Sequence, residues 1–308
     1  MTVSTAPRRT LTRLVTSLLA ASLAMGLFGA VGATAVTTYS TSTKMILHNI
    51  PPEDLLANTQ GVCDGSFDIV IRAVGTVTGA RQYLDAAQAC GLKVVFSFSL
   101  TTNGGTVYPA RVGAWVRAVK DHPALFGYLS VKEPSWIGIS GAEIRALYHA
   151  YKAADPSHPV IGLFGDIPHF GMTKNPYTAG MADIVMVDWY PVETGRGGCS
   201  SVGTTYVPYG PKWFSTRVHP VVAGKTRGVP IWVMVQTHKY TSPSCHKKQH
   251  PTAALMDRQV REALRYAGAT GIAYQTFRNV NYQSDLRRDT YLMGKLKSIT
   301  AAVRAGTY

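Results

Sequence analysis

The stretch Pro230-Ile-Trp-Val-Met-Val-Gln-Thr-His238 is apolar almost to its end, and it decides the fold. A strand with one solvent-exposed face alternates apolar and polar residues. A strand buried on both faces has a continuous run of Val, Ile and similar residues. This run therefore predicts a parallel strand that helices cover on the outside. Its polar end places Gln236 and His238 where such a strand stops.

Seven more runs of this kind occur along the chain, separated by segments with helical periodicity. The eight predicted strands are Lys44–Ile50, Phe67–Ala73, Leu92–Ser99, Ala124–Val131, Pro159–Gly165, Ala182–Tyr190, Pro230–His238 and Gly271–Phe277. Residues 44–308 provide about 33 residues for each strand-and-helix unit, which is typical of a single closed (β/α)8 TIM barrel. The alternative is a doubly wound open sheet, but Ile50-Pro51-Pro52 stands where its Gly-rich phosphate loop would be.

Helical periodicity fills most of the intervals between these strands. Thr78–Gly91, Pro109–Asp121 and Pro251–Ala267 each carry an apolar stripe at helical spacing. Ser140-Gly-Ala-Glu143 has the pattern of a capping box and predicts a helix through residue 154. The fifth crossover, around Asn175–Gly180, has barely a helical pattern.

The amino-terminal segment has the pattern of an export signal. Three arginines precede an uncharged apolar run, Leu14–Val31, which is followed by Ala33-Thr34-Ala35. We therefore expect residues 1–35 to be a cleaved signal peptide, 36–43 a linker and 44–308 the barrel. The alternative is an uncleaved membrane anchor, since about 20 apolar residues span a bilayer. Cleavage leaves a secreted protein with no stable membrane span, whether or not the arginine pair acts as a twin-arginine signal.

Composition excludes several classes of protein. With 46% hydrophobic and 16% charged residues among 308, the chain is not disordered, collagenous or a coiled coil. The formal charge of +14 falls to +11 without the signal peptide, which contains three Arg and no acidic residue. A basic exported protein favours anionic wall polymers, acidic glycans or membrane surfaces as partners, and the alternative is that its charge only keeps the protein soluble. No nucleic-acid-binding motif accompanies the charge, so no nucleic-acid partner is expected.

Four cysteines, Cys63, Cys90, Cys199 and Cys245, predict two disulfides in an exported chain. Three pairings are possible. We favour Cys63–Cys90, because these residues bracket one strand-and-helix unit, and Cys199–Cys245, because both lie in long loops expected to share a face. A metal site around Cys245 lacks a second ligand pair at regular spacing. No metal or organic cofactor is therefore expected.

In a barrel of this kind the functional residues lie at the carboxyl ends of the strands. The residues at those ends with polar or aromatic side chains are His48, Asn49, Arg72, Ser97, Ser99, Lys132, Glu133, Asp166, Asp188, Trp189, Tyr190, Gln236, His238, Gln275 and Phe277. This concentration of polar side chains predicts a binding or catalytic site at the carboxyl end of the barrel.

Part of this rim resembles a known group of enzymes. Phe126-Gly-Tyr-Leu-Ser-Val-Lys-Glu-Pro134 looks like the strand-four segment of clan A glycoside hydrolases, where Glu-Pro follows Asn or Asp. Ala182–Pro191 is similar to the strand-six segment of that group, and Arg72 matches its strand-two arginine. Tyr274-Gln-Thr-Phe277 resembles its last strand. The resemblance covers most of residues 44–280.

The resemblance implies that Glu133 protonates the glycosidic oxygen and that a carboxylate ending strand seven attacks the anomeric carbon. Gln236 stands at that second position, and an amide does not form a covalent glycosyl intermediate. Asp188, at the end of strand six, is the candidate base of an inverting hydrolase, whose two carboxyl groups lie about 6.5–9.5 Å apart. Asp166 is the reserve candidate. Alternatively, each of these carboxylates is structural, for example as a partner of Arg72.

Lys132 is a second departure from the family pattern. An ammonium beside Glu133 stabilises the ionised form of a group that should donate a proton. Two explanations are open: Lys132 points away from the site, or it binds a negatively charged sugar such as a uronic acid. The second agrees with the basic composition.

Aromatic rings at the rim would stack on sugar rings, or would only plug the barrel. The expected substrate contacts are Arg72, His48, Lys132, Trp136, Asp166, Trp189, Tyr190, Gln236 and Gln275. We therefore expect a secreted glycoside hydrolase-like protein that cleaves an oligo- or polysaccharide, anionic or derived from a cell wall. One alternative is a carbohydrate-binding barrel without catalysis, and another is a secreted scaffold with no sugar site. The sequence predicts no particular oligomeric state.

Overall fold

The computed structural model describes residues 43–98, 108–134, 138–164, 178–190, 192–194, 204–206, 228–238, 240–241, 247–248, 251–278 and 286–308. Contacts divide the chain into two units, Met1–Val36 and Thr37–Tyr308. The first unit, with the predicted signal peptide, lies outside the described residues. Within the described ranges, no helix is long and apolar enough to cross a membrane.

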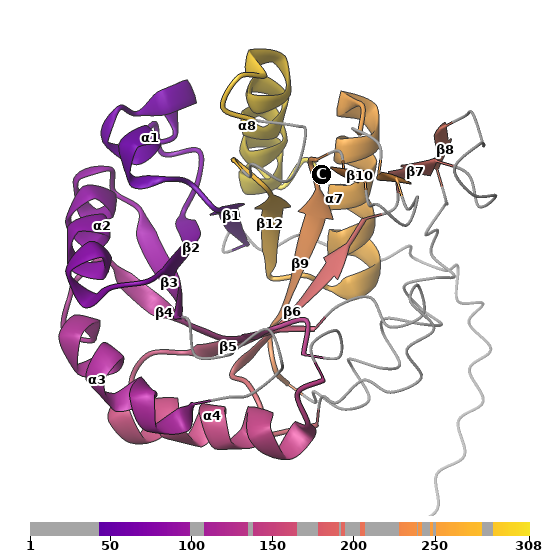
Figure 1. Ribbon diagram of the computed structural model, residues 1–308. Helices are drawn as coiled ribbons and strands as arrows, with labels where there is room; N and C mark the ends of the chain where they lie inside the picture. Colours follow the sequence, from indigo (N-terminus) through magenta and orange to yellow (C-terminus); the bar gives the residue numbers. More distant parts are fainter. Residues whose placement is uncertain are drawn as a thin grey trace, which may run out of the picture. The chain divides into compact units, whose positions relative to one another are not determined.

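Eight parallel strands close into a barrel, which confirms the predicted fold class (Figure 1). Their order around the ring is β1, β12, β9, β6, β5, β4, β3 and β2, and β1 pairs with both β12 and β2. The bounds are β1 Lys44–His48, β2 Ile69–Val74, β3 Lys93–Phe98, β4 Leu125–Lys132, β5 Val160–Phe164, β6 Ile184–Trp189, β9 Ile231–Gln236 and β12 Gly271–Gln275. Strand β1 ends earlier than predicted, because Asn49 adopts a left-handed φ of 66°.

Helices follow most of the strands and surround the barrel in Figure 1. They are α1 Pro52–Leu56, α2 Val77–Ala89, α3 Pro109–Val119, α4 Gly141–Ala154, α7 Ala253–Ala267 and α8 Thr290–Arg304, with a 3-10 turn, η1, at Thr59–Gly61. The predicted capping box is present, since the Glu143 N–H donates to Ser140 Oγ and the Ser140 N–H donates to Glu143 Oε2. Residues 178–183, the described part of the fifth crossover, contain no helix.

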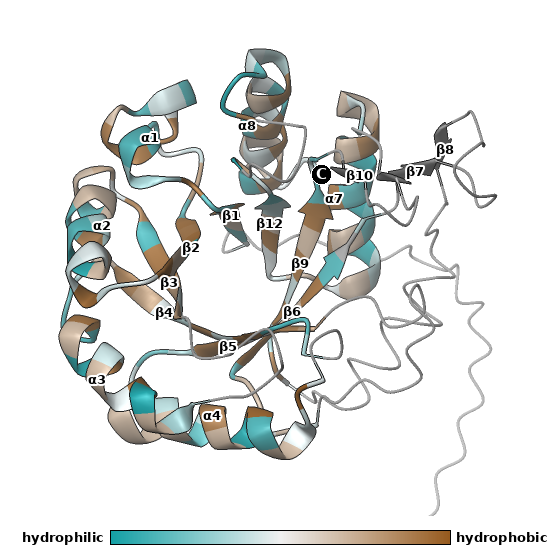
Figure 2. Cartoon of the chain, viewed as in Figure 1, coloured by the Kyte–Doolittle hydropathy of each residue, from teal (hydrophilic) through white to brown (hydrophobic). Residues whose placement is uncertain are grey.

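Alternate residues of each strand pack on opposite sides of the barrel wall. Ile46, Leu163, Met186 and Met234 belong to the cluster that fills the interior, whereas residues one position away pack against the helices. Figure 2 shows the hydrophobic character of β5, β6 and β9, with polar residues concentrated on the helices. The interior is thus a packed core, and any open site has to lie at one end of it.

The base of this inner core depends on one glycine. Trp232 is buried in the interior, and a Cβ built on the neighbouring Gly271 would lie only 2.5 Å from the indole ring. Since real Cβ contacts are longer than this, only glycine leaves room for the ring here. The indole of Trp232 on β9 therefore occupies the space that a side chain at position 271 of β12 would need.

A small antiparallel sheet, which the sequence analysis did not predict, follows two of the barrel strands. Its strands are β7 Val192–Thr194, β8 Thr204–Tyr206, β10 Tyr240–Thr241 and β11 Lys247–Lys248, in the order β10-β11-β7-β8. The segments after β6 and after β9 each supply two of them. Cys199 and Cys245, whose pairing stays a prediction, lie outside the described residues.

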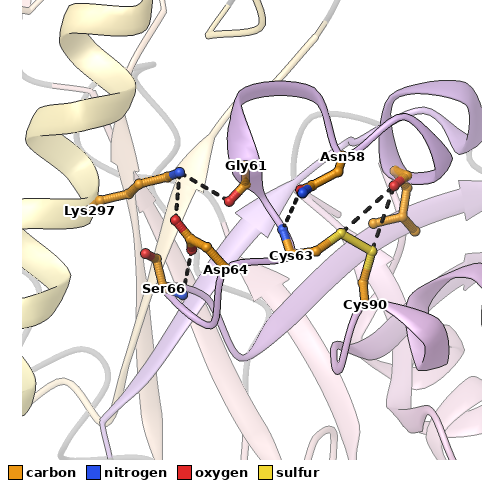
Figure 3. Close-up of a disulfide and its surroundings, with 8 residues drawn as sticks. Asn58, Gly61, Cys63, Asp64, Ser66, Cys90 and Lys297 are labelled. Carbon is orange, nitrogen blue, oxygen red and sulfur yellow. Dashed lines mark hydrogen bonds and ion pairs between the residues drawn. A yellow bond between two sulfur atoms is a disulfide. The ribbon is translucent and has the colours of Figure 1, made fainter.

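The predicted disulfide between Cys63 and Cys90 is present (Figure 3). It joins the turn before β2 to the end of α2, at the amino-terminal end of the strands. The Cys63 N–H donates to Asn58 Oδ1 at 2.9 Å. Beside it, Lys297 of α8 forms an ion pair with Asp64 at 2.7 Å. The disulfide thus ties the turn before β2 to α2, and the ion pair ties the same turn to α8.

Replacing Cys63 and Cys90 together by Ala should destabilise the protein. The bridge spans a sequence separation of 27, for which loop-closure entropy predicts about 3.5 kcal/mol. We expect urea titration to show a loss of this size in the free energy of unfolding. Ser66→Ala, in the same turn, is the matched control and should change it by less than about 0.5 kcal/mol. A double variant as stable as the control would contradict this role.

Asp155 forms the densest polar network at the amino-terminal end of the barrel. Its buried carboxylate accepts hydrogen bonds from Tyr128 Oη at 2.7 Å and from Ser157 Oγ at 2.6 Å, and His158 Nδ1 lies 2.7 Å away. Burial by itself raises the pKa of Asp155. The bonds from Ser157, Tyr128 and His158 outweigh burial and hold that pKa below its ordinary value.

This network should make stability depend on pH. Because the pKa of Asp155 is lower in the folded protein, its contribution is complete above about pH 4 and is lost as the pH falls further. Asp155→Asn should cost about 2 kcal/mol at pH 7. In thermal unfolding from pH 7 to pH 3, the difference from the native protein should shrink towards pH 3. The exposed control Asp121→Asn should show neither effect, and a difference independent of pH would be the contrary result.

Candidate functional site

Strand register brings five of the expected site residues to the inner face of the barrel at its carboxyl end. His48 pairs with Ile71, Lys132 with Leu163 and Asp188 with Met234, and all three partners belong to the inner cluster. Residues paired across parallel strands face the same side of the wall. Gln236 and Gln275 pair with each other, two positions beyond the inner residues Met234 and Ala273. These five positions form a polar ring above the apolar interior.

Lys132 faces the interior because β4 contains an irregularity. Tyr128 packs outward and Leu129 inward, but Val131 packs outward again, with a register shift between Leu129 and Val131. An extra residue in a strand exchanges the two faces beyond it. Lys132 therefore lies on the inner side of the wall, where it is exposed to solvent. The explanation in which this side chain points away from the site is not supported by the register.

Glu133 follows directly, at the point where β4 ends. Its N–H donates to the Leu163 carbonyl at 2.7 Å, and its backbone is left-handed, with a φ of 47°. The half-buried carboxylate makes no hydrogen bond or ion pair with any residue that the structure describes. A left-handed non-glycine residue costs about 1–2 kcal/mol, and strain of this kind is often retained at functional sites.

Gln236 is fully buried, and its amide and backbone form hydrogen bonds within the protein. Its side-chain Nε2 donates to the His238 carbonyl at 3.1 Å, while its backbone N–H donates to Gln259 Oε1 at 2.9 Å. His238 Nδ1 lies 3.0 Å from the Gln275 carbonyl oxygen, so this nitrogen carries the proton. The residue at the expected nucleophile position is thus part of a structural amide network. Gln259, on α7, was missed by the sequence analysis because it lies within an ordinary amphipathic helix.

Asp188 ends β6 on the inner side and is 3% exposed. The next described aromatic ring, Tyr190, packs against the inner cluster, and its hydroxyl lies 3.4 Å from Met234 Sδ. The Tyr190 and His238 rings meet edge to face, with their centroids 4.8 Å apart. Together they form one aromatic wall beside Asp188.

Arg72 occupies a different place from the ring. It pairs with Phe96, which packs against the helices, so its position on β2 faces outward. Its guanidinium Nη1 donates to Asn49 Oδ1 at 2.7 Å, and Asn49 Nδ2 donates to the Arg278 carbonyl at 2.5 Å. Arg72 thus supports the segment after β1, and a direct contact with substrate stays a prediction.

His48 differs electrostatically from the other residues of the ring. Its Nδ1 is buried and has no hydrogen-bond partner among the described residues. Burial is the largest cause that lowers the pKa of His48 well below its ordinary value, followed by the positive charges of Lys132 and Arg72 and by His238. His48 is therefore a neutral imidazole at pH 7.

Three expected contacts lie beyond this description. Trp136 and Asp166 are outside the described residues, and of Trp189 only the backbone is described. Among the described residues, no three His, Cys, Asp or Glu side chains are grouped as metal ligands.

Solved structures share this barrel, although neither a protein-family model nor a curated protein sequence matches the chain. One is a β-galactosidase from Marinomonas, with a TM-score of 0.61, 11% identity, and coverage of 84% of this chain and 59% of the other. Another is a β-galacturonidase from Eisenbergiella tayi bound to galacturonate, with a TM-score of 0.59, 12% identity, and coverage of 83% of this chain and 50% of the other. A third is a GH5_18 protein from Streptomyces cattleya in complex with Manβ1-4GlcNAc. Its TM-score is 0.59 and its identity 13%, with coverage of 85% of this chain and 80% of the other.

The fold is that of glycoside hydrolase barrels. The chain spans only 59% and 50% of the first two neighbours, and identities of 11–13% establish the likeness of fold alone. The chemistry of this chain therefore depends on the residues at the carboxyl end of its barrel.

The left-handed backbone at Glu133 can be tested with two variants that both remove the carboxylate. At a regular position Gly is less stable than Ala, but a left-handed φ reverses this order. We expect Glu133→Gly to be about 1 kcal/mol more stable than Glu133→Ala in urea titration. A more stable Ala variant would show that Glu133 is not left-handed.

Proposed function

We propose that this protein hydrolyses glycosidic bonds at the carboxyl end of its barrel, with Glu133 as general acid and Asp188 as general base. The observation that supports the proposal is that two acidic residues, Glu133 and Asp188, stand where β4 and β6 finish, at the carboxyl end of the barrel. Glu133 protonates the glycosidic oxygen as the bond breaks. Asp188 takes a proton from the water that attacks the anomeric carbon from the opposite side.

The inverting form of this reaction is proposed because β9 lacks the carboxylate that the retaining form needs. β5 separates β4 from β6 in the ring, so Glu133 and Asp188 are on strands that are not neighbours. Inverting enzymes need about 6.5–9.5 Å between carboxyl groups so that a water fits between them. A retaining reaction would need a carboxylate on β9, where Gln236 stands with its amide bonded to the backbone.

The other expected contacts are given supporting roles in this proposal. Tyr190, Trp136 and Trp189 would stack on sugar faces, and Asp166 remains the reserve carboxylate. Gln236 and Gln275 line the floor of the site, while Arg72 acts through Asn49. The candidate signal peptide and the Cys63–Cys90 bridge support action outside the cell, because disulfides persist there.

The second candidate is a carbohydrate-binding barrel without catalysis. One observation favours it: the amide of Gln236 stands where the glycoside hydrolases that this chain resembles carry their nucleophile. In such a protein the polar ring and the aromatic wall would hold a glycan, and Glu133 would only accept hydrogen bonds.

Hydrolysis of a panel of plant, fungal and bacterial-wall glycans tests the proposal. We expect the native protein to release reducing ends, and Glu133→Gln and Asp188→Asn each to reduce the rate by about 10²–10⁴-fold. Proton NMR of the first product should show an inverted anomer. Asp121→Asn, an exposed carboxylate at the other end of the barrel, is the control and should keep full activity.

The outcomes separate the two candidates. Equal turnover by native protein and Glu133→Gln removes the acid assignment, and a retained anomeric configuration removes the role of Asp188 as base. Glycan binding without turnover by the native protein identifies the binding barrel. Thermal unfolding of each variant shows whether a loss reflects chemistry or folding.

A further inference from the structure

The side chain of Lys132 places positive charge at the barrel mouth. Lys132 faces inward from β4, is exposed to solvent, and makes no ion pair or hydrogen bond with any residue in the described ranges. Glu133, its neighbour in sequence, lies in the left-handed region and forms no ion pair with it. Lys132 is thus a cation held over the interior without a protein counter-ion among these residues.

His48 faces the same space from β1. Its Nδ1 is buried without a partner, and burying a ring nitrogen in this way is costly unless a ligand or water completes the bond. The charge of Lys132 reaches this ring, because it contributes to lowering the pKa of His48. Arg72, the next largest charge acting on His48, adds positive potential from behind the wall.

Resting on the proposed glycan site, we infer that Lys132 and His48 form a subsite for the carboxylate of an acidic sugar. Lys132 supplies the positive charge, and the neutral imidazole of His48 donates a hydrogen bond to a carboxylate or hydroxyl oxygen of the same sugar. The ligand class is an oligosaccharide that contains a uronic acid.

The same lysine would discriminate against neutral sugars. A neutral ring placed over Lys132 removes water from the ammonium and returns no opposite charge, whereas a uronic acid replaces that water with an ion pair. The methyl ester of a uronic acid has the same ring and linkage without the charge. Acid and ester are therefore matched probes of this one interaction.

Titration calorimetry of the full protein with galacturonate- and glucuronate-containing oligosaccharides, each beside its methyl ester, tests the subsite. We expect the acid to bind about tenfold more tightly than the ester, with a preference that narrows as NaCl rises. Lys132→Gln should abolish the preference and leave the affinity for the ester unchanged or higher. Lys120→Gln, the same charge change at the end of α3 that leads into β4, should keep the preference.

Each outcome decides between the claims. Equal affinity for acid and ester, or a preference that survives in Lys132→Gln, overturns the subsite and leaves the proposed function standing. Sodium acetate that binds as tightly as the acidic oligosaccharide overturns it too, since a general anion site would then suffice. If neither acid nor ester is bound while a neutral glycan of the panel is cleaved, the subsite fails and the proposed function stands. If no glycan of the panel is bound or cleaved either, the proposed function fails, and the subsite fails with it.

Discussion

Alternation of side chains across a closed wall of eight strands decides which residues of this protein meet. The inner positions of β6 and β9 are apolar through Met186 and Met234, and the next inner positions on these strands, Asp188 and Gln236, are polar. Hydrophobic burial fixes the lower layers, and the pleat then fixes the direction of the residue two positions further along. His48, Lys132 and Asp188 therefore face the same space, although the described residues show no hydrogen bond or ion pair that joins these three side chains to one another.

The irregularity in β4 modifies this rule at the place where it matters most. Without the register shift between Leu129 and Val131, Lys132 would face the helices, and its charge would not point into the mouth. The strand then ends on Glu133 in a left-handed conformation that costs free energy. This bulge and strained residue on β4, together with the buried amide network on β9, mark this end of the barrel as the part that stability alone does not explain.

Local patterns carried most of the sequence prediction. Apolar runs gave all eight strands, and Ser140 with Glu143 gave a helix start, because strand burial and capping depend on neighbouring residues. Local patterns could not predict that Lys132 faces the interior, because the bulge that turns it inward depends on the pairing of β4 with β5. Gln259 was missed for a similar reason: its partner, Gln236, lies on another element. The small sheet of β7, β8, β10 and β11 has strands of two or three residues, too short for any periodicity.

A crystal structure of the Glu133→Gln variant soaked with an acidic oligosaccharide would show whether a sugar binds at the carboxyl end of the barrel, between residue 133 and Asp188. We expect a glycosidic oxygen within hydrogen-bond distance of residue 133, a water or sugar carbon beside Asp188, and a sugar carboxylate at Lys132. A sugar bound elsewhere, or a residue 133 side chain directed towards the outer helices, would rule out the proposed site.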